Sequence, residues 1–327
     1  MTDELMLNEL RSRATILARL AREEDLGAGD VTAALNPRPD EPLTARLIAR
    51  QPGVLAGREI AHQVLAVYSD QIEMCWRDGI GDGTHWNDVP SELAVLRGMA
   101  GDVLAAERVL LNFLQRLCGI ATLTREFVDA VAGTGAAIFD TRKTTPGWRA
   151  LEKYAVRCGG GCNHRMGLYD AVLIKDNHIV GVSTERLAGH VFGMLNALAA
   201  RNTRSNVHDH GGPRFTAGLS PRPGEARGER PSFIAVEADT LEQVEALLTV
   251  VGIDVILLDN FLPAKMRQAV ELRDRRNLRG KVALEASGGI TLHNVRTVAA
   301  TGVERISVGA ITHSAPAIDL ALERTAE

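Results

Sequence analysis

Short aliphatic runs that end in polar residues dominate the chain after residue 133. Each run is apolar for a few consecutive positions and then meets Gly, hydroxyl or charged residues: AAIFDTRKTT, DAVLIKDNH, FIAVEAD, DVILLDN, KVALEASGG and RISVGAITHS. Continuous apolar strands of this type are typical of a parallel sheet that is buried on both faces. The pattern therefore predicts parallel strands with polar residues at their carboxyl ends.

The segments between these runs carry helix signals. A capping box, Thr240-Leu-Glu-Gln243, opens a helix expected over residues 241–250. Pro263 suits the first turn of the next helix, and Thr291 and Ser314 are candidate N-caps for the last two. Alternating strands and helices imply right-handed crossovers, in a barrel or an open α/β sheet. We favour a barrel, because (β/α) barrels carry their active sites just past the strand carboxyl ends.

The chain before residue 133 mixes helical and strand periodicities. Its patterns predict helices over residues 6–20 and 60–68, strands over 43–51, 71–78 and 92–98, and a helical pair over 107–118 and 122–132. A chain of 327 residues is long enough for about two domains. We therefore expect a mixed α/β layer followed by the barrel.

Residues 201–231 break the pattern of both halves. The segment holds six Arg, five Gly and four Pro, with very few large apolar residues. Such a composition buries too little apolar surface to offset the entropy of ordering, so we interpret it as a flexible surface insertion. A lid or a partner-binding loop is the alternative.

Composition and charge exclude several classes of protein. Hydrophobic residues make up 45% and charged residues 24% of the chain, as in soluble globular proteins. The net charge of −4 argues against a general nucleic-acid or anionic-membrane binder. No apolar run approaches a membrane span, the amino-terminal stretch lacks the features of a signal peptide, and the 4 Cys are too few for a disulfide scaffold. We expect a cytoplasmic protein.

The charge is distributed unevenly along the chain. Residues 142–175 contain seven basic and two acidic residues, a local charge of +5, which leaves −9 for the remainder. Because these cations flank strands that look fully buried, we expect a convergent anion site rather than a solvated charged face. Cys158, Cys162 and His164 could instead suggest zinc, but a fourth ligand is missing nearby, and the Gly residues between the cysteines more simply shape a loop.

The later strand ends supply other groups. Glu237 and Asp259 end two neighbouring strands, where they could hold Mg²⁺, accept hydrogen bonds from sugar hydroxyls, or pair with the basic residues. Two Gly-containing loops, Ser287-Gly288-Gly289 and Val308-Gly309-Ala310, precede expected helices and suit a phosphate. No Cys–His or Ser–His pair has a recognisable spacing, so catalysis is expected to rest on positioning and electrostatics.

Together these motifs resemble the quinolinate phosphoribosyltransferase family. The segments that carry the resemblance are EDLGAGDVT, ERVLLNFLQRLCGIAT, DTRKTTPGWRALEKYAVRCGGGCNHRMGLYDAVLIKDNHI, ILLDNF, LEASGGI and ISVGAITHS. It runs from about residue 24 to about residue 322, with the insertion as an interruption. The resemblance implies an α/β fold with an N-terminal open α/β sandwich domain over residues 1–118. It also implies an incomplete (β/α) barrel domain over 119–327, and a homodimer or dimer-based hexamer with shared active sites.

The resemblance also implies a reaction and a set of site residues. The reaction joins quinolinate to 5-phosphoribosyl 1-diphosphate with Mg²⁺, giving nicotinate mononucleotide, pyrophosphate and CO₂ in the de novo synthesis of NAD. Lys143, Glu237 and Asp259 are the implied catalytic residues, and the two acids the tentative metal ligands. The other implied substrate-binding residues are Arg108 from the partner subunit, Thr141, Arg142, His164, Arg165, Lys175, Ser287, Gly288, Gly289, Val308, Gly309 and Ala310.

Two rival interpretations remain. One is a paralogue associated with molybdenum transport, which shares the fold and many motifs. The other is a non-catalytic dimer that binds phosphoribosyl ligands and uses its Arg-rich loop to bind partners. The intact TRK, NHR and LLDN segments argue against the first, and Glu237 and Asp259 argue against the second.

Overall fold

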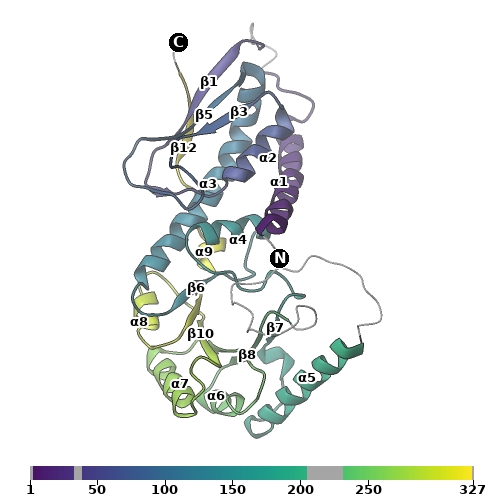
Figure 1. The fold of residues 1–327 in the computed structure, drawn as a ribbon, viewed down its shortest axis with the longest axis vertical. Helices are drawn as coiled ribbons and strands as arrows, with labels where there is room; N and C mark the ends of the chain where they lie inside the picture. The colour runs from purple at the N-terminus through teal and green to yellow at the C-terminus, as the bar shows by residue number, and fades with distance from the viewer. Residues whose placement is uncertain (1–2, 33–38, 205–230, 326–327) are drawn as a thin grey trace. The chain divides into compact units, whose positions relative to one another are not determined.

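The structure, a computed structural model, describes residues 3–32, 39–204 and 231–325 (Figure 1). It consists of two compact units. The first contains Met1–Glu126, Lys143–Gly161 and Ile311–Glu327, and the second contains Phe127–Arg142 and Cys162–Ala310. The chain thus passes between the units several times. The domain boundary expected at residues 118 and 119 falls inside a continuous helix, and it stays a prediction.

The first unit is built on a four-stranded antiparallel sheet with the strand order β12-β1-β5-β3. These strands are β1 (Pro42–Ala49), β3 (Glu73–Trp76), β5 (Ser91–Met99) and β12 (Leu320–Arg324), and β2 (Gly53–Val54) pairs with β4 (His85–Trp86). In β1, Leu43, Ala45 and Leu47 are buried while Arg46 is exposed, as expected for a sheet with one solvated face.

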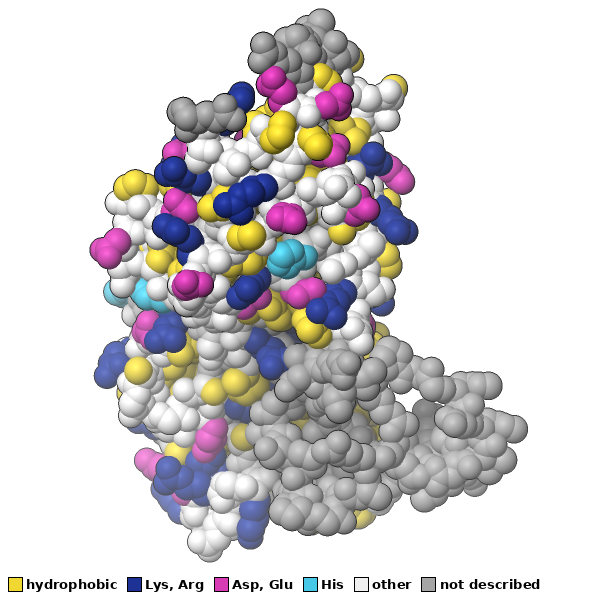
Figure 2. All heavy atoms as spheres, turned by 45° about the horizontal axis from the view of Figure 1, so that its top comes forward, with side chains coloured by type: hydrophobic (Ala, Val, Ile, Leu, Met, Phe, Trp, Pro, Cys, Tyr) yellow, Lys and Arg dark blue, Asp and Glu magenta, His cyan; other side chains and the backbone are white. Residues whose placement is uncertain are grey.

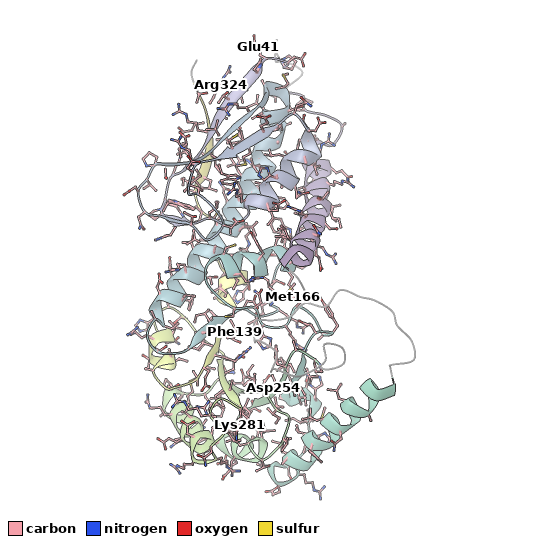
Figure 3. All side chains as sticks on the ribbon, viewed as in Figure 1. Glu41, Phe139, Met166, Asp254, Lys281 and Arg324 are labelled. Atoms are coloured by element: carbon pink, nitrogen blue, oxygen red, sulfur yellow. The ribbon has the colours of Figure 1, made fainter. Side chains whose placement is uncertain are left out.

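The strand β12 was not predicted from the sequence. It comes from the carboxyl end of the chain and pairs antiparallel with β1, placing Ala45 opposite Arg324. Figure 3 shows Glu41 and Arg324 at the same end of this sheet, as antiparallel pairing requires. The last residues of the chain therefore complete the first unit.

The helices of the first unit are α1 (Asp3–Leu26), α2 (Arg58–Tyr68), α3 (Ala100–Ala130) and α4 (Arg149–Cys158), together with most of α9 (Ala310–His313). The expected helical pair over 107–118 and 122–132 is wrong, because α3 continues through both. Gly119 does not end the helix. It allows close packing instead, since a Cβ at this position would overlap the backbone carbonyl of Pro316.

The second unit confirms the expected parallel sheet. All six predicted runs are strands, in the order β6-β11-β10-β9-β8-β7 and parallel throughout. They are β6 (Ala137–Phe139), β7 (Val172–Ile174), β8 (Ile234–Ala238), β9 (Val255–Asp259), β10 (Ala283–Ser287) and β11 (Arg305–Ser307). Since β6 and β7 are consecutive in the chain yet lie at opposite ends of the order, the sheet is that of an incomplete barrel. The expected α/β fold class is thereby confirmed.

Helices cover the outer side of these strands (Figure 1). They are α5 (Thr184–Arg204), α6 (Leu241–Leu247), α7 (Pro263–Arg275) and α8 (Val295–Ala299), with a 3-10 turn, η2, at Asp176–His178. The capping box at Thr240 is confirmed, because its hydroxyl accepts the Gln243 N–H and the Gln243 side chain accepts the Thr240 N–H. Pro263 is confirmed as the first residue of α7.

The two remaining N-cap predictions concern Thr291 and Ser314. Thr291 as the N-cap of α8 is wrong, because α8 starts at Val295 and its N-cap is Asn294. The chain already turns at Thr291, whose carbonyl accepts the Val295 N–H. Ser314 as an N-cap is wrong. The chain enters α9 directly after Gly309, so Ser314 lies past the end of that helix.

Two further expectations concern the surface and the insertion. No helix of the described residues is long and apolar enough to cross a membrane. Figure 2 shows basic and acidic side chains interspersed over the visible face. The insertion expected at 201–231 lies largely outside the described residues, which reach Arg204 at the end of α5 and resume at Pro231.

The packing at Gly119 yields a testable prediction. Gly119→Ala should lower the free energy of unfolding by about 3 kcal/mol, because the atoms that meet the new Cβ are backbone atoms of Pro316 and Ala317 and cannot move aside. The matched control is Gly189→Ala in α5, where nothing lies within 4 Å. It should be neutral or add up to about 1 kcal/mol through helix propensity. Urea denaturation measures both, and equal effects of the two substitutions would contradict this account.

Candidate active site

The polar residues of the second unit lie at the carboxyl ends of its strands. Asp254 directly precedes β9 and Lys281 lies two residues before β10, whereas Phe139 ends β6. Figure 3 shows Phe139 at the opposite end of the parallel strands from Asp254 and Lys281. Since the strands are parallel, the residues that follow each strand gather on the Phe139 side, where barrels bind ligands.

Asp140 fastens the loop that carries the predicted His164-Arg165 pair. This carboxylate has no exposed surface and directly follows β6. It accepts the His164 N–H at 2.8 Å and the Asn163 side-chain amide at 2.7 Å. In addition, the backbone of Phe139 pairs with that of Cys162 in an isolated parallel β-bridge. The segment after the Gly-rich turn is therefore held against the end of β6.

His164 is buried, with its ring held between Arg165 and Glu285. Its Nδ1 accepts the Arg165 backbone N–H at 2.8 Å, which places the proton on Nε2. Nε2 lies 3.5 Å from a carboxylate oxygen of Glu285, and the ring meets Phe233 edge-on at 5.0 Å. The predicted residue His164 is thus fixed in orientation by three neighbours.

Glu285 forms a buried ion pair that the sequence analysis missed. It has no exposed surface, receives the Arg305 Nε–H at 2.6 Å and accepts the hydroxyl of Ser307. Burial alone raises the pKa of Glu285, but the nearby His164 and Arg305 and the hydrogen bonds from Ser307 and Arg305 outweigh burial and lower it. Arg305 also stacks on the Phe139 ring at 3.7 Å. The available signal was a charged residue inside one apolar run, Glu285 in VALEAS, and another at the start of the next run, Arg305 in RISV.

Arg165 is the most buried arginine of the predicted anion site. Its guanidinium donates to the Ala171 carbonyl at 3.3 Å. Burial and the charge of Arg142 lower the pKa of Arg165, while Asp170 raises it. The effect of Arg142 means that two guanidinium groups are close enough to repel each other. An arrangement of this kind favours an anionic ligand.

The acidic group follows β8 and β9. Ligand oxygens of Glu237, Asp239 and Asp259 all lie within 4.8 Å of one another, and Lys175 reaches Glu237 at 3.0 Å. Burial raises the pKa of Glu237, Lys175 lowers it, and Asp259 raises it further. Burial, then Asp259, raise the pKa of Asp239 as well. Asp239 was missed although it lies two positions after Glu237, on the same side of the strand, so alternation could have indicated it.

The loop after β10 requires glycine at position 288. Gly288 has φ +91°, and a Cβ there would overlap the side chain of Asn260. Asn260 itself has φ 53°, donates its side-chain amide to Asp259 at 2.8 Å, and donates its backbone N–H to the Ser287 carbonyl at 2.9 Å. The predicted Ser287–Gly289 loop is therefore packed directly on the end of β9. In the other predicted loop, Val308 donates its N–H to the Phe139 carbonyl at 2.9 Å.

Arg108 and Lys143 belong to the first unit. Arg108 is exposed on α3, and Lys143 is exposed immediately after Arg142. The zinc alternative finds no support: among the described residues, the only group of three or more His, Cys, Asp or Glu side chains with metal-like spacing is the acidic one. Burial also raises the pKa of Cys158, whereas a metal ligand needs the thiolate.

Comparison with known proteins identifies close relatives along the whole chain. The family described as "Quinolinate phosphoribosyl transferase, N-terminal domain" matches residues 30–118, and the corresponding C-terminal domain matches 120–194 and 224–323. The gap at 195–223 falls partly within the segment interpreted as an insertion.

Individual relatives agree with the family match. A nicotinate-nucleotide pyrophosphorylase (carboxylating) of Mycobacterium leprae is 40% identical over 93% of this chain and 95% of its own. A mitochondrial quinolinate phosphoribosyltransferase (decarboxylating) of Nicotiana tabacum is 34% identical over 93% of this chain and 80% of its own. The solved nicotinate-nucleotide pyrophosphorylase of Francisella tularensis superimposes with a TM-score of 0.76 at 34% identity, covering 96% of this chain and 97% of the other.

The buried Glu285–Arg305 pair predicts how stability depends on pH. Glu285→Gln should cost about 3 kcal/mol at pH 7, because it leaves the Arg305 cation buried without its carboxylate. The pKa of Glu285 is lower in the folded state than in the unfolded chain. The unfolded chain therefore binds the extra proton first, and the stability difference should shrink as the pH falls below about 4.3. Urea denaturation of the wild-type and Glu285→Gln proteins between pH 7 and pH 3 measures this. A difference that stays constant down to pH 3 would rule out the charged pair.

Proposed function

The chain belongs to the quinolinate phosphoribosyltransferase family, and from that membership we propose that it transfers the phosphoribosyl group of 5-phosphoribosyl 1-diphosphate to quinolinate with decarboxylation. The products are nicotinate mononucleotide, pyrophosphate and CO₂, as needed for de novo synthesis of NAD. The observation that carries the proposal is the match of both family domains to one chain whose strand ends hold basic and acidic residues.

The basic residues suit the anionic parts of both substrates. We assign Thr141, Arg142, Lys143, His164, Arg165 and Lys175 to the quinolinate carboxylates and the diphosphate. Guanidinium groups bind carboxylate and phosphate through paired hydrogen bonds. The repulsion between Arg142 and Arg165, expressed in the lowered pKa of Arg165, supports an anion between them.

The acidic residues suit the ribose and a magnesium ion. Glu237 and Asp259, with Asp239 beside them, supply hard carboxylate oxygens at a spacing that fits one divalent cation. When bound, Mg²⁺ would offset the charge of the diphosphate and ease its departure. Burial, and then the charge of Asp259, raise the pKa of Glu237 and of Asp239, and a bound cation would favour the charged form of both carboxylates.

The residues of this chain account for the steps of the reaction. As the bond from C1 to pyrophosphate breaks, positive charge develops on the ribose, and the carboxylates of Glu237 and Asp259 stabilise it. The pyridine nitrogen attacks C1, and the ring becomes a cation. The 2-carboxylate then leaves as CO₂, its bonding electron pair stays on C2 next to the ring nitrogen cation, and C2 takes up a proton. Lys143 orients that carboxylate.

The two glycine-containing loops suit the 5′-phosphate. Ser287, Gly288 and Gly289 follow β10, and Val308, Gly309 and Ala310 follow β11. Gly289 has φ +62° and nothing lies within 4 Å of the place a Cβ would take, so a ligand can approach the backbone closely there. Barrels often bind a substrate phosphate between the loops after their last strands.

We further propose a homodimer, or a hexamer built from three such dimers, in which Arg108 reaches the neighbouring subunit's site. The exposure of Arg108 on α3 supports this role. A cytoplasmic location is supported by the four cysteines, none of which forms a disulfide in the described part of the chain, since disulfides are rare in reducing compartments.

Purified protein should form nicotinate mononucleotide from quinolinate and 5-phosphoribosyl 1-diphosphate, and the reaction should require Mg²⁺. Lys143→Ala should lower kcat/KM by a factor on the order of 10³ through loss of a positioned cation. Because Lys143 is exposed, the Lys143→Ala protein should unfold at nearly the same thermal midpoint as the wild type. The matched control is the exposed Lys281→Ala, which should leave both quantities unchanged. A folded wild-type protein that forms no product would refute the proposed function, and a large midpoint loss in Lys143→Ala would indicate a structural role for this lysine.

The shared-site proposal is tested with mixed dimers. A subunit with Arg108→Ala and a subunit with Lys143→Ala should each be nearly inactive as homodimers. In a heterodimer purified through two different tags, one of the two sites contains both residues, so it should recover roughly half the wild-type activity. A verified heterodimer that shows no recovery would place Arg108 outside the partner's site.

A further inference from the structure

Two pieces of the long motifs, LQRL and LEKY, have no part in the reaction described above. They contain Arg116 on α3 and Glu152 on α4. The Glu152 carboxylate has no exposed surface, and a carboxylate in that position costs free energy unless it is paired. Its partners therefore indicate what it is for.

Glu152 holds the loop that follows Lys143. Its carboxylate accepts the Thr145 backbone N–H at 3.1 Å and the Thr145 hydroxyl at 2.8 Å. It also receives Arg116 through Nε at 3.2 Å and Nη2 at 2.8 Å. Thr145 is two residues from Lys143, so the carboxylate fixes the backbone on one side of that lysine.

Thr312 of α9 holds the other side. Its hydroxyl donates to the Lys143 backbone carbonyl at 2.8 Å. Arg116 returns to the same segment, because its guanidinium donates to the Thr312 carbonyl and, at 3.1 Å, to the Ala315 carbonyl. The contacts thus form a closed circuit from Arg116 to Glu152, to the Lys143–Thr145 backbone, to Thr312 and back to Arg116. All of these residues lie in the first unit.

We propose that Arg116, Glu152 and Thr312 are positioning residues that fix the backbone at Lys143 and so determine where its ammonium group lies. The inference rests on the proposed function, in which Lys143 contacts substrate. Thr312 is the most direct member, since its hydroxyl bonds to the carbonyl of Lys143 itself. A displacement of about 1 Å in a catalytic group can cost a factor of roughly 10² in rate, so one lost hydrogen bond here should be visible in turnover.

Thr312 allows a test that separates position from stability. Thr312→Val keeps the shape and removes the hydroxyl, whereas Thr312→Ser keeps the hydroxyl and removes a buried methyl group. Both should lower the thermal midpoint by a few degrees. Only Thr312→Val should lower kcat/KM, by about tenfold, and Thr312→Ser should restore it to within about threefold of wild type.

The matched control is Thr301→Val in the second unit. Thr301 is also buried, and its hydroxyl donates to the Val298 backbone carbonyl at 2.7 Å. Thr301→Val therefore removes the same kind of hydrogen bond at a place away from Lys143. Its thermal midpoint should fall by about as much as that of Thr312→Val, while kcat/KM stays unchanged. The proposal is overturned if kcat/KM falls in all three variants in proportion to the fall in thermal midpoint. It is also overturned if Thr312→Val keeps full activity.

Hydrogen exchange provides a readout that does not depend on turnover. The Thr145 amide, bonded to Glu152, should exchange faster in Thr312→Val than in Thr312→Ser or Thr301→Val. Unchanged exchange over residues 141–147 would show that the circuit does not hold this loop. An inactive wild-type protein would refute the proposed function, and with it the assignment of a catalytic Lys143. The exchange data would then still decide whether the circuit fixes the backbone.

Discussion

The structure depends on the requirement that a carboxylate without contact to water must be paired. Among the described residues, Asp140, Glu152 and Glu285 have no exposed surface, and each binds a segment that is distant in the sequence. Asp140 holds the loop at His164, Glu152 holds the loop at Lys143, and Glu285 joins β10 to β11 and faces the imidazole of His164. The loops that carry the predicted site residues His164 and Lys143 are thus held by buried carboxylates.

This use of buried acids explains the local excess of positive charge. The stretch from residue 142 to 175 contains only two acids, Glu152 and Asp170, and both are buried. Glu152 bonds to Thr145 and Arg116, and Asp170 accepts the backbone N–H groups of Met166 and Gly167. Because their charge is directed at the backbone and at Arg116, the basic side chains nearer the surface retain much of their field for a ligand. The net charge of −4 hides this separation.

Local patterns predicted the elements of the fold better than the contacts between them. Six apolar runs, the capping box at Thr240 and the Pro263 start of α7 follow from neighbouring residues alone, and all are present. The pairing of β12 with β1 joins opposite ends of the chain, which no local period encodes. The partners of Glu285 and Glu152 likewise depend on register and packing. The family resemblance implied a set of site residues, which stays a prediction, and it did not indicate the buried groups that hold their loops.

Like charges are grouped twice in the second unit, and each group is unfavourable without a ligand. The guanidinium of Arg142 contributes to lowering the pKa of Arg165, and Asp259 contributes to raising the pKa of Glu237 and of Asp239. The scaffold sustains this repulsion, since backbone and buried carboxylates fix the loops that carry the charges. A ligand relieves both groups only if it offers negative charge to the first and positive charge to the second. A diphosphate and a pyridine dicarboxylate, together with a ribose that becomes cationic as its leaving group departs, meet both demands, so the same electrostatic arrangement favours binding and the transition state.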